Sequence, residues 1–324
     1  MATRTWKLPG TSLGVRLAGT YTERLSWYLE GLRLVETDAD DSLPCIDVLP
    51  LDTAQITGDR DPQVVQKDDW ISISASDGRV EFQAGRPGSR LHLIAALPDE
   101  PVALGVALFR ALLHHGAVWT HALAFELDGR SCLVLGPSGS GKSTLAAAVL
   151  SAGGVLVSDD AVLIEQDARG QIRAHSLRSF ARFRAPAHRL LPPSLACQLH
   201  PSERPGSWYL DFSDMGTQQD LSTVPDSLWL LGTRHERPLH SSAEPASQAS
   251  GLSHWIEATI PCFFHSAWPT EQLALLRTIG DWLTQLSSHE LLVGCSLMDT
   301  PGDALRDLLA LTGPTAPHAG RHGG

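Results

Sequence analysis

The residues best suited to chemistry lie in one short glycine-rich segment. Residues 136–144 read GPSGSGKST and match the pattern G-x-x-x-x-G-K-[ST]. Glycine lets backbone N–H groups turn inward without a clash at Cβ, so such a segment can form a concave cradle for phosphate oxygens. The pattern therefore predicts a nucleotide-binding loop that consists of Gly136, Pro137, Ser138, Gly139, Ser140, Gly141, Lys142, Ser143 and Thr144.

Two side chains of this loop have separate expected tasks. Lys142 is placed to reach the β- and γ-phosphates of a triphosphate, and Ser143 to ligate magnesium. An apolar run at residues 131–136 leads into the loop, and a helical pattern over residues 143–152 follows it. This order favours binding because the helix then points its positive N-terminal end at the phosphates.

A pair of adjacent carboxylates ends the next apolar run. Asp159 and Asp160 follow VLVS at residues 155–158, and Asp159 comes sixteen positions after Ser143. That spacing allows one helix and one return strand, which would bring the pair beside the phosphates. A carboxylate near the γ-phosphate can orient an acceptor hydroxyl and take its proton. The alternative interpretation is a polar strand end that caps a turn.

A histidine upstream completes an ordered set of motifs. His121 lies in VWTHALAF, fifteen residues before Gly136. The order of His121, a GxSGxGKS loop, a Gly-Gly pair and Asp159-Asp160 resembles the bacterial HPr kinase/phosphorylase family and its wider group of HPr-kinase-like proteins. That group is related in fold to phosphoenolpyruvate carboxykinases. The resemblance covers residues 118–165 and extends more weakly to residue 232.

The resemblance implies a fold, a reaction and a set of residue roles. The expected fold class is α/β, with a kinase core built on a mixed sheet and a smaller N-terminal α/β region. The expected reaction is phosphoryl transfer from ATP, with Mg²⁺, to a serine hydroxyl. The family forms closed rings, so a homo-oligomer is also an expectation. The implied roles are proton acceptor for Asp159, magnesium ligands for Ser143 and Asp160, a position near the terminal phosphate for His121, and phosphate binding for Lys142.

The downstream region points to an acceptor other than HPr. The Glu-hydrophobic-Arg-Gly signature of true HPr kinases does not occur, and Arg178, Arg182 and Arg184 stand in that region. We expect a peptide or small protein that bears a serine, such as the precursor of a ribosomally made lasso peptide. Two other functions stay open: a kinase for a small-molecule hydroxyl, and a non-catalytic regulator that responds to nucleotide.

Hydrophobic periodicity predicts the elements that position these residues. Turns are expected at Asp77-Gly78 and Asp128-Gly129, and residues 178–205, rich in Arg and Pro, are expected to be loop. Helices are predicted over residues 22–35, 100–115, 143–152, 270–286 and 303–311, and strands over 118–127, 131–136, 155–160, 227–232 and 290–296. We divide the chain into an N-terminal, acceptor-binding α/β region (1–98), the kinase domain (99–312) and a disordered tail (313–324).

Composition excludes several classes of function. Among 324 residues, 36 are acidic and 25 basic, and the formal net charge of −11 argues against nucleic-acid binding. The five cysteines are scattered and form no CxxC pair, so neither a disulfide framework nor a zinc site is expected. The N terminus lacks the apolar core of a signal peptide, and no long apolar run would span a membrane. We expect a cytoplasmic protein without a membrane partner.

Overall fold

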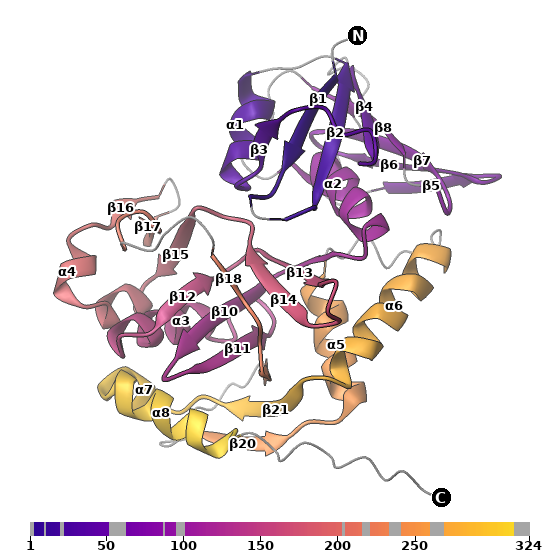
Figure 1. Ribbon diagram of the computed structural model, residues 1–324. Coiled ribbons are helices and arrows are strands. Elements are labelled where there is room, and N and C mark those ends of the chain that lie inside the picture. The colour runs from indigo at the N-terminus through magenta and orange to yellow at the C-terminus, as the bar shows by residue number, and fades with distance from the viewer. Residues whose placement is uncertain are drawn as a thin grey trace, which may run out of the picture.

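A computed structural model of the chain describes residues 3–9, 11–19, 23–51, 63–86, 88–94, 101–202, 205–215, 221–232, 241–259 and 269–313. Helices and several mixed sheets form an α/β fold, which confirms the expected class. Figure 1 shows an upper, N-terminal unit and a lower unit that carries the rest of the chain. Helix α2 (Val102–His114) packs against the N-terminal sheet and leads into the lower unit.

The N-terminal unit is built on an eight-stranded sheet in the order β3-β1-β2-β4-β8-β7-β6-β5. Its strands are β1 (Thr3–Lys7), β2 (Gly14–Gly19), β3 (Val35–Thr37), β4 (Cys45–Pro50), β5 (Gln63–Lys67), β6 (Trp70–Ala75), β7 (Gly78–Gln83) and β8 (Ser89–Leu93). Along β6 buried and less buried residues alternate, because successive side chains point to opposite faces of the sheet and α2 packs against one of them.

Helix α1 (Glu23–Gly31) buries Leu25 and Leu29 of the predicted apolar stripe, and Leu32, directly after the helix, is buried as well. It ends earlier than the predicted residue 35. Arg33 adopts a left-handed conformation with φ 57°, and the backbone N–H of Leu34 bonds back to the carbonyl of Leu29 at 3.0 Å. Such a left-handed residue with a backward hydrogen bond is a common way to terminate a helix.

The lower unit contains a six-stranded sheet in the order β12-β10-β11-β19-β21-β20. Its strands are β10 (Ala122–Leu127), β11 (Arg130–Leu135), β12 (Val155–Ser158), β19 (Ser227–Leu231), β20 (Ser242–Pro245) and β21 (Ser287–Leu292). β11, β19 and β21 run parallel, whereas β10, β12 and β20 pair antiparallel. The helices of this unit are α3 (Lys142–Ser151), α4 (Pro193–Ala196), α5 (Gln248–Ala258), α6 (Pro269–Leu283), α7 (Ser296–Asp299) and α8 (Pro301–Leu311).

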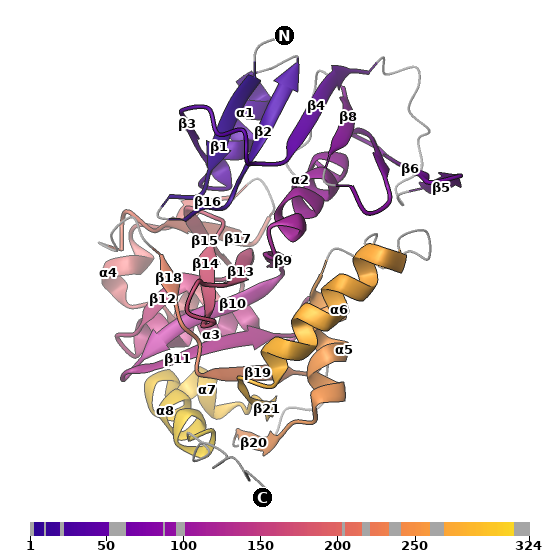
Figure 2. The ribbon, with the colours of Figure 1, turned by 45° about the vertical axis from the view of Figure 1, so that its right-hand side comes forward.

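Two smaller sheets complete the lower unit. One has the order β18-β14-β13-β9 and the other the order β15-β17-β16. Their strands are β9 (Val118–Thr120), β13 (Val162–Gln166), β14 (Ile172–Ser176), β18 (Ser222–Thr223), β15 (Phe180–Arg184), β16 (His200–Pro201) and β17 (Ser207–Asp211). Figure 2 shows α6 reaching from the lower unit toward α2, so two helices link the units.

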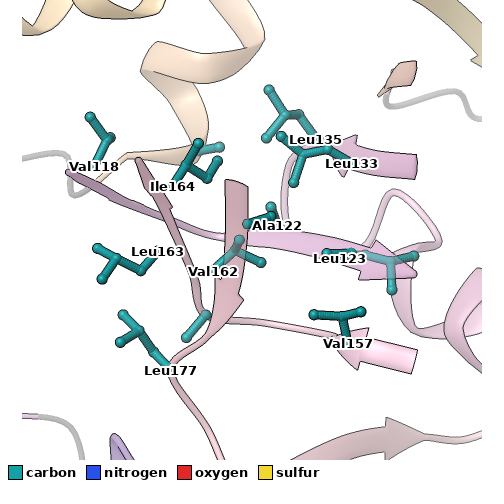
Figure 3. Packing of buried hydrophobic residues seen from close by; sticks show 14 of the residues in the cluster. Val118, Ala122, Leu123, Leu133, Leu135, Val157, Val162, Leu163, Ile164 and Leu177 are labelled. Atoms are coloured by element: carbon teal, nitrogen blue, oxygen red, sulfur yellow. The ribbon is translucent and has the colours of Figure 1, made fainter. Parts of the chain in front are cut away.

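The chain crosses between the six-stranded and four-stranded sheets at two neighbouring points. The first crossing is at His121, between β9 and β10, and the second is at residues 159–161, between β12 and β13. The crossings are adjacent because β9 pairs with β13 and β10 pairs with β12. Figure 3 shows the apolar packing around them, to which the buried side chains of Val118, Ala122, Val157 and Val162 contribute.

The two predicted Asp-Gly turns have different outcomes. Asp128 and Gly129 form the expected two-residue turn, with φ 51° and 75° between the paired Leu127 and Arg130. The prediction for Asp77-Gly78 was wrong, because Ala75 pairs with Gly78 and leaves residues 76 and 77 as the turn. Gly78 belongs to β7, where a Cβ would lie 2.2 Å from the carbonyl oxygen of His92.

The prediction of loop over residues 178–205 was also wrong. This stretch contains β15, a 3₁₀ helix η2 (Ala187–Leu190), α4 and β16. Along β15, Ala181 and Phe183 are buried, whereas Arg182 and Arg184 are on the other face. The residues therefore alternate as in a regular strand, although the arginines suggested a loop. The strand predicted at residues 290–296 begins earlier, as β21, and residues 296–299 are helical. Of the predicted tail, residues 314–324 lie outside the described residues.

Candidate functional site

The glycine-rich loop connects β11 to α3, as its sequence predicts. Gly139 and Gly141 have φ 84° and 112°, conformations that strain any residue with a Cβ. At Gly136 a Cβ would lie 2.8 Å from the carbonyl oxygen of Leu231 on the neighbouring strand. The backbone therefore requires glycine at three positions of the loop.

The loop holds polar groups that the protein leaves uncommitted. Among the residues that the structure describes, no side chain caps the N terminus of α3, so the backbone N–H groups of its first turn can donate to a ligand. The Ser140 hydroxyl is buried without a hydrogen-bond partner among the described residues. A glycine-shaped cradle with unused donors at a helix N terminus fits a phosphate group.

Lys142 is buried inside this loop. Its ammonium group donates hydrogen bonds to the carbonyl oxygens of Gly136 and of Pro137, the latter at 3.2 Å. Burial lowers the pKa of Lys142 to about 8, although the nearby charges of Asp160 and Asp159 act against this change. A phosphate anion would bring the lysine a better partner than two carbonyl groups.

The two aspartates have opposite electrostatic surroundings. Asp159 is 5% exposed, and burial beside Asp160 raises its pKa to about 7, although its Oδ2 accepts the backbone N–H of Arg182 at 2.6 Å. Burial also acts to raise the pKa of Asp160, but the hydrogen bond and charge of His121 and the charge of Arg178 outweigh it and lower that pKa. Such a separation gives neighbouring carboxylates different chemical roles.

Asp160 is held from two sides. Its Oδ1 lies 2.7 Å from Nδ1 of His121, and its Oδ2 lies 3.5 Å from Nε of Arg178. His121 is itself anchored, because its backbone N–H donates to the carbonyl of Ala258 at the end of α5 at 2.8 Å. The sheet crossings thus bring together His121 and Asp160. The sequence indicated the aspartate pair by its place at a strand end and His121 through the family resemblance, but not their contact.

These groups line one pocket of about 230 Å³. Its lining residues are His121, Ser138, Gly139, Gly141, Lys142, Ser143, Thr144, Asp159, Asp160, Arg182, Arg184, Ala185, Pro186 and Ala187. The predicted loop residues Gly136, Pro137 and Ser140 belong to the same loop but not to this lining. Of the three arginines, two line the pocket, whereas Arg178 contacts Asp160. Sequence reasoning missed Ala185, Pro186 and Ala187, whose only signal is their position directly after Arg184.

The predicted magnesium ligands, Ser143 and Asp160, both line this pocket. Within the part of the chain that the structure describes, no group of three or more His, Cys, Asp and Glu side chains is arranged to hold a metal ion. Magnesium is commonly bound through one or two protein ligands together with phosphate oxygens and water. Ser143 and Asp160 therefore suit a magnesium ion that arrives with a nucleotide.

No protein-family model matches this chain, and no curated protein matches it. The resemblance to the HPr kinase group stays a prediction. In the described residues, no helix is both long enough and apolar enough to cross a membrane.

Proposed function

We propose that this chain is an ATP- and magnesium-dependent kinase that transfers the γ-phosphate to a serine hydroxyl of a peptide or small protein. A ribosomally made precursor of the lasso type belongs to this acceptor class. The proposal is carried by one observation: the glycine-rich loop and Asp159 line the same pocket. Phosphoryl transfer needs a phosphate cradle and a proton acceptor in one place.

The proposal includes a kinase core of the HPr kinase and phosphoenolpyruvate carboxykinase type in the lower unit. Three features support it: a mixed central sheet, a helix that begins at the glycine-rich loop, and a histidine that contacts the second aspartate. These features follow one another along the chain in the order that the resemblance implies.

The residues divide the work between binding and proton transfer. Backbone N–H groups of the loop, together with Lys142, bind and orient the phosphates. Bound ATP with its magnesium supplies the transferable phosphoryl group. Asp159 orients the acceptor hydroxyl and takes its proton, a role suited to a carboxylate whose pKa is about 7. Asp160 stays ionised and contributes to the metal site with Ser143, while His121 fixes its orientation.

The test uses the purified chain with ATP, Mg²⁺ and a library of serine-containing peptides, read by mass spectrometry. Peptides are expected to gain the mass of one phosphate. Asp159→Asn should lower the rate of transfer by about 10²- to 10⁴-fold while retaining ATP binding, and Lys142→Ala should weaken ATP binding itself. Asp281→Asn on α6 and Arg169→Ala in the turn between β13 and β14 remove charges of the same signs at exposed positions of the lower unit, and both should behave as the wild-type chain does.

Two outcomes would contradict the proposal. If ATP binds but only small hydroxyl compounds gain phosphate, the chain is a small-molecule kinase. If ATP binds and no acceptor of either kind is modified, the non-catalytic regulator is the better interpretation. Calorimetric titration with ATP separates both outcomes from a simple failure to bind nucleotide.

A further inference from the structure

One face of the small sheet β15-β17-β16 continues outward from the pocket. Arg182 on β15 lines the pocket, and the antiparallel register places Tyr209 of β17 opposite it. His200 of β16 lies opposite Tyr209. Directly opposed residues share a face of the sheet, so these three side chains form one row that leads away from the pocket.

Aromatic rings on this face form an ordered, accessible surface. Tyr209 is 37% exposed, and its ring stacks on His200 with centroids 5.1 Å apart. Its other neighbour is Phe180, which meets it edge-on at 5.9 Å. We call Phe180, Tyr209 and His200 the aromatic platform. Trp208 does not belong to it, because the alternation of β17 turns Trp208 to the opposite face, where it stacks on His188 at 4.0 Å.

The platform is continuous with the aspartate pair and not only with the pocket wall. The guanidinium of Arg178, which contacts Asp160, lies over the ring of Phe180 at 5.5 Å. The backbone N–H of Arg182, the first residue of the row, binds Asp159. The platform therefore begins where the proposed proton acceptor lies, which is the side of the pocket where an acceptor hydroxyl must bind.

The dimensions of the platform suit a short peptide segment. Adjacent strands lie about 4.8 Å apart, so the row from Arg182 to His200 extends about 10 Å from the pocket wall. An extended peptide covers that length with about three residues. A small hydroxyl compound held beside Asp159 would leave this surface unused.

We propose that the aromatic platform binds the acceptor peptide beside the phosphorylated hydroxyl, with an apolar or aromatic side chain of the peptide packed on Tyr209. This inference rests on the proposed kinase function and narrows its acceptor to an extended peptide. It also assigns specificity to Tyr209, because an exposed ring supplies contact area with little loss of side-chain freedom.

The test compares Tyr209→Ala with Tyr209→Phe, using a serine peptide selected from the library. Since an aromatic contact contributes about 0.5–1.5 kcal/mol, Tyr209→Ala should raise the KM for the peptide roughly two- to twelvefold. The KM for ATP and kcat should not change, and Tyr209→Phe should restore peptide binding. Leu311→Ala is the control, since Leu311 is likewise an exposed apolar side chain but lies at the end of α8 and does not line the pocket.

A second variant and a second measurement distinguish a loss of peptide binding from misfolding of the Tyr209→Ala variant. His200→Ala changes a side chain that is 53% exposed and should raise the KM for the peptide in the same direction. Peptide libraries with varied residues around the serine should show an apolar or aromatic preference that the Tyr209→Ala variant loses.

Three results would overturn the inference. If Tyr209→Ala raises the KM for ATP instead, the platform holds the nucleotide base. If neither KM changes, the platform binds neither substrate. In both cases peptide phosphorylation itself persists, so the proposed function stands. If the wild-type chain phosphorylates no peptide while binding ATP, the inference falls together with the peptide-kinase proposal.

Discussion

Both units of the molecule bury charged side chains, but the charges have different surroundings. At the base of the N-terminal unit, Arg110 is fully buried and donates to Glu271 at 3.2 Å, to the Ser89 hydroxyl at 2.8 Å and to the carbonyl of Arg86 at 2.9 Å. In the lower unit, Lys142 and Asp159 are buried around a pocket. Burial of a charge alone therefore does not identify a functional site.

The two sets of buried charges differ in their contacts and in their pKa values. Arg110 fastens the loop between β7 and β8, and Glu271 joins this cluster from α6 by accepting the backbone N–H of Gly85 at 2.9 Å. In the pocket, by contrast, burial brings the pKa of Lys142 to about 8 and that of Asp159 to about 7, whereas the pKa of Arg110, also lowered by burial, is about 10. We expect substitutions in the first cluster to change stability and substitutions in the pocket to change activity.

The largest expected effect is on catalysis. Asp159→Asn should lower kcat by about 10²- to 10⁴-fold, the usual contribution of a proton acceptor. Its free energy of unfolding should not fall, because the variant removes a buried charge. Steady-state kinetics measure the change in kcat, and urea unfolding measures the free energy of unfolding. A variant that keeps its activity, or that loses activity only by unfolding, would erase the contrast between the units.

For the buried pair of Arg110 and Glu271, we expect a loss of stability without a change in ATP binding. Arg110→Met leaves Glu271 buried without its partner and should lower the free energy of unfolding by about 3–5 kcal/mol. The KM for ATP should stay the same in the folded fraction. Urea unfolding measures the loss, and Arg306→Met, at an exposed pair with Asp128, should cost at most about 1 kcal/mol. Replacing both partners, with Arg110→Met and Glu271→Leu, should recover part of the loss.

The pH dependence of activity should come from the pocket alone. The proton acceptor works when ionised, so kcat/KM should rise with pH through about 7 as Asp159 loses its proton. It should fall above about 8 as Lys142 loses its positive charge. Initial rates at low ATP concentration give this profile for the free enzyme. The Arg110→Met variant should keep the same profile, and a profile that shifts with Arg110 would contradict the separation of roles.

The smallest effect concerns the buried aspartate of the N-terminal unit. Asp77 accepts the backbone N–H of Ala103 at 3.0 Å, at the start of α2. Losing a cap of this kind usually costs about 1 kcal/mol, so Asp77→Ala should lower the free energy of unfolding by that amount. Exposed Asp38→Ala serves as the control in thermal unfolding. A change in kcat at full folding would show that the N-terminal unit takes part in catalysis.

Local sequence patterns predicted the elements around the site. The turn at Asp128-Gly129, the strand before the loop and the helix after it are confirmed, because glycine freedom and apolar periodicity act over a few residues. Patterns failed where a distant contact decides. Gly78 entered a strand because the backbone of β8 approaches it closely, and β15 was missed because its arginines face a pocket that other segments complete.

The sequence by itself determined the composition of the candidate site: the glycine-rich loop, the aspartate pair and a histidine upstream, in an order that a known family also shows. The tertiary structure decided how these groups meet. Sheet pairing of β9 with β13 and of β10 with β12 set His121 against Asp160. Burial raised the pKa of Asp159, while the hydrogen bond and charge of His121 lowered that of Asp160, so the two pKa values moved apart. Long-range register and burial produce these relations, and neither is encoded in the spacing of a single motif.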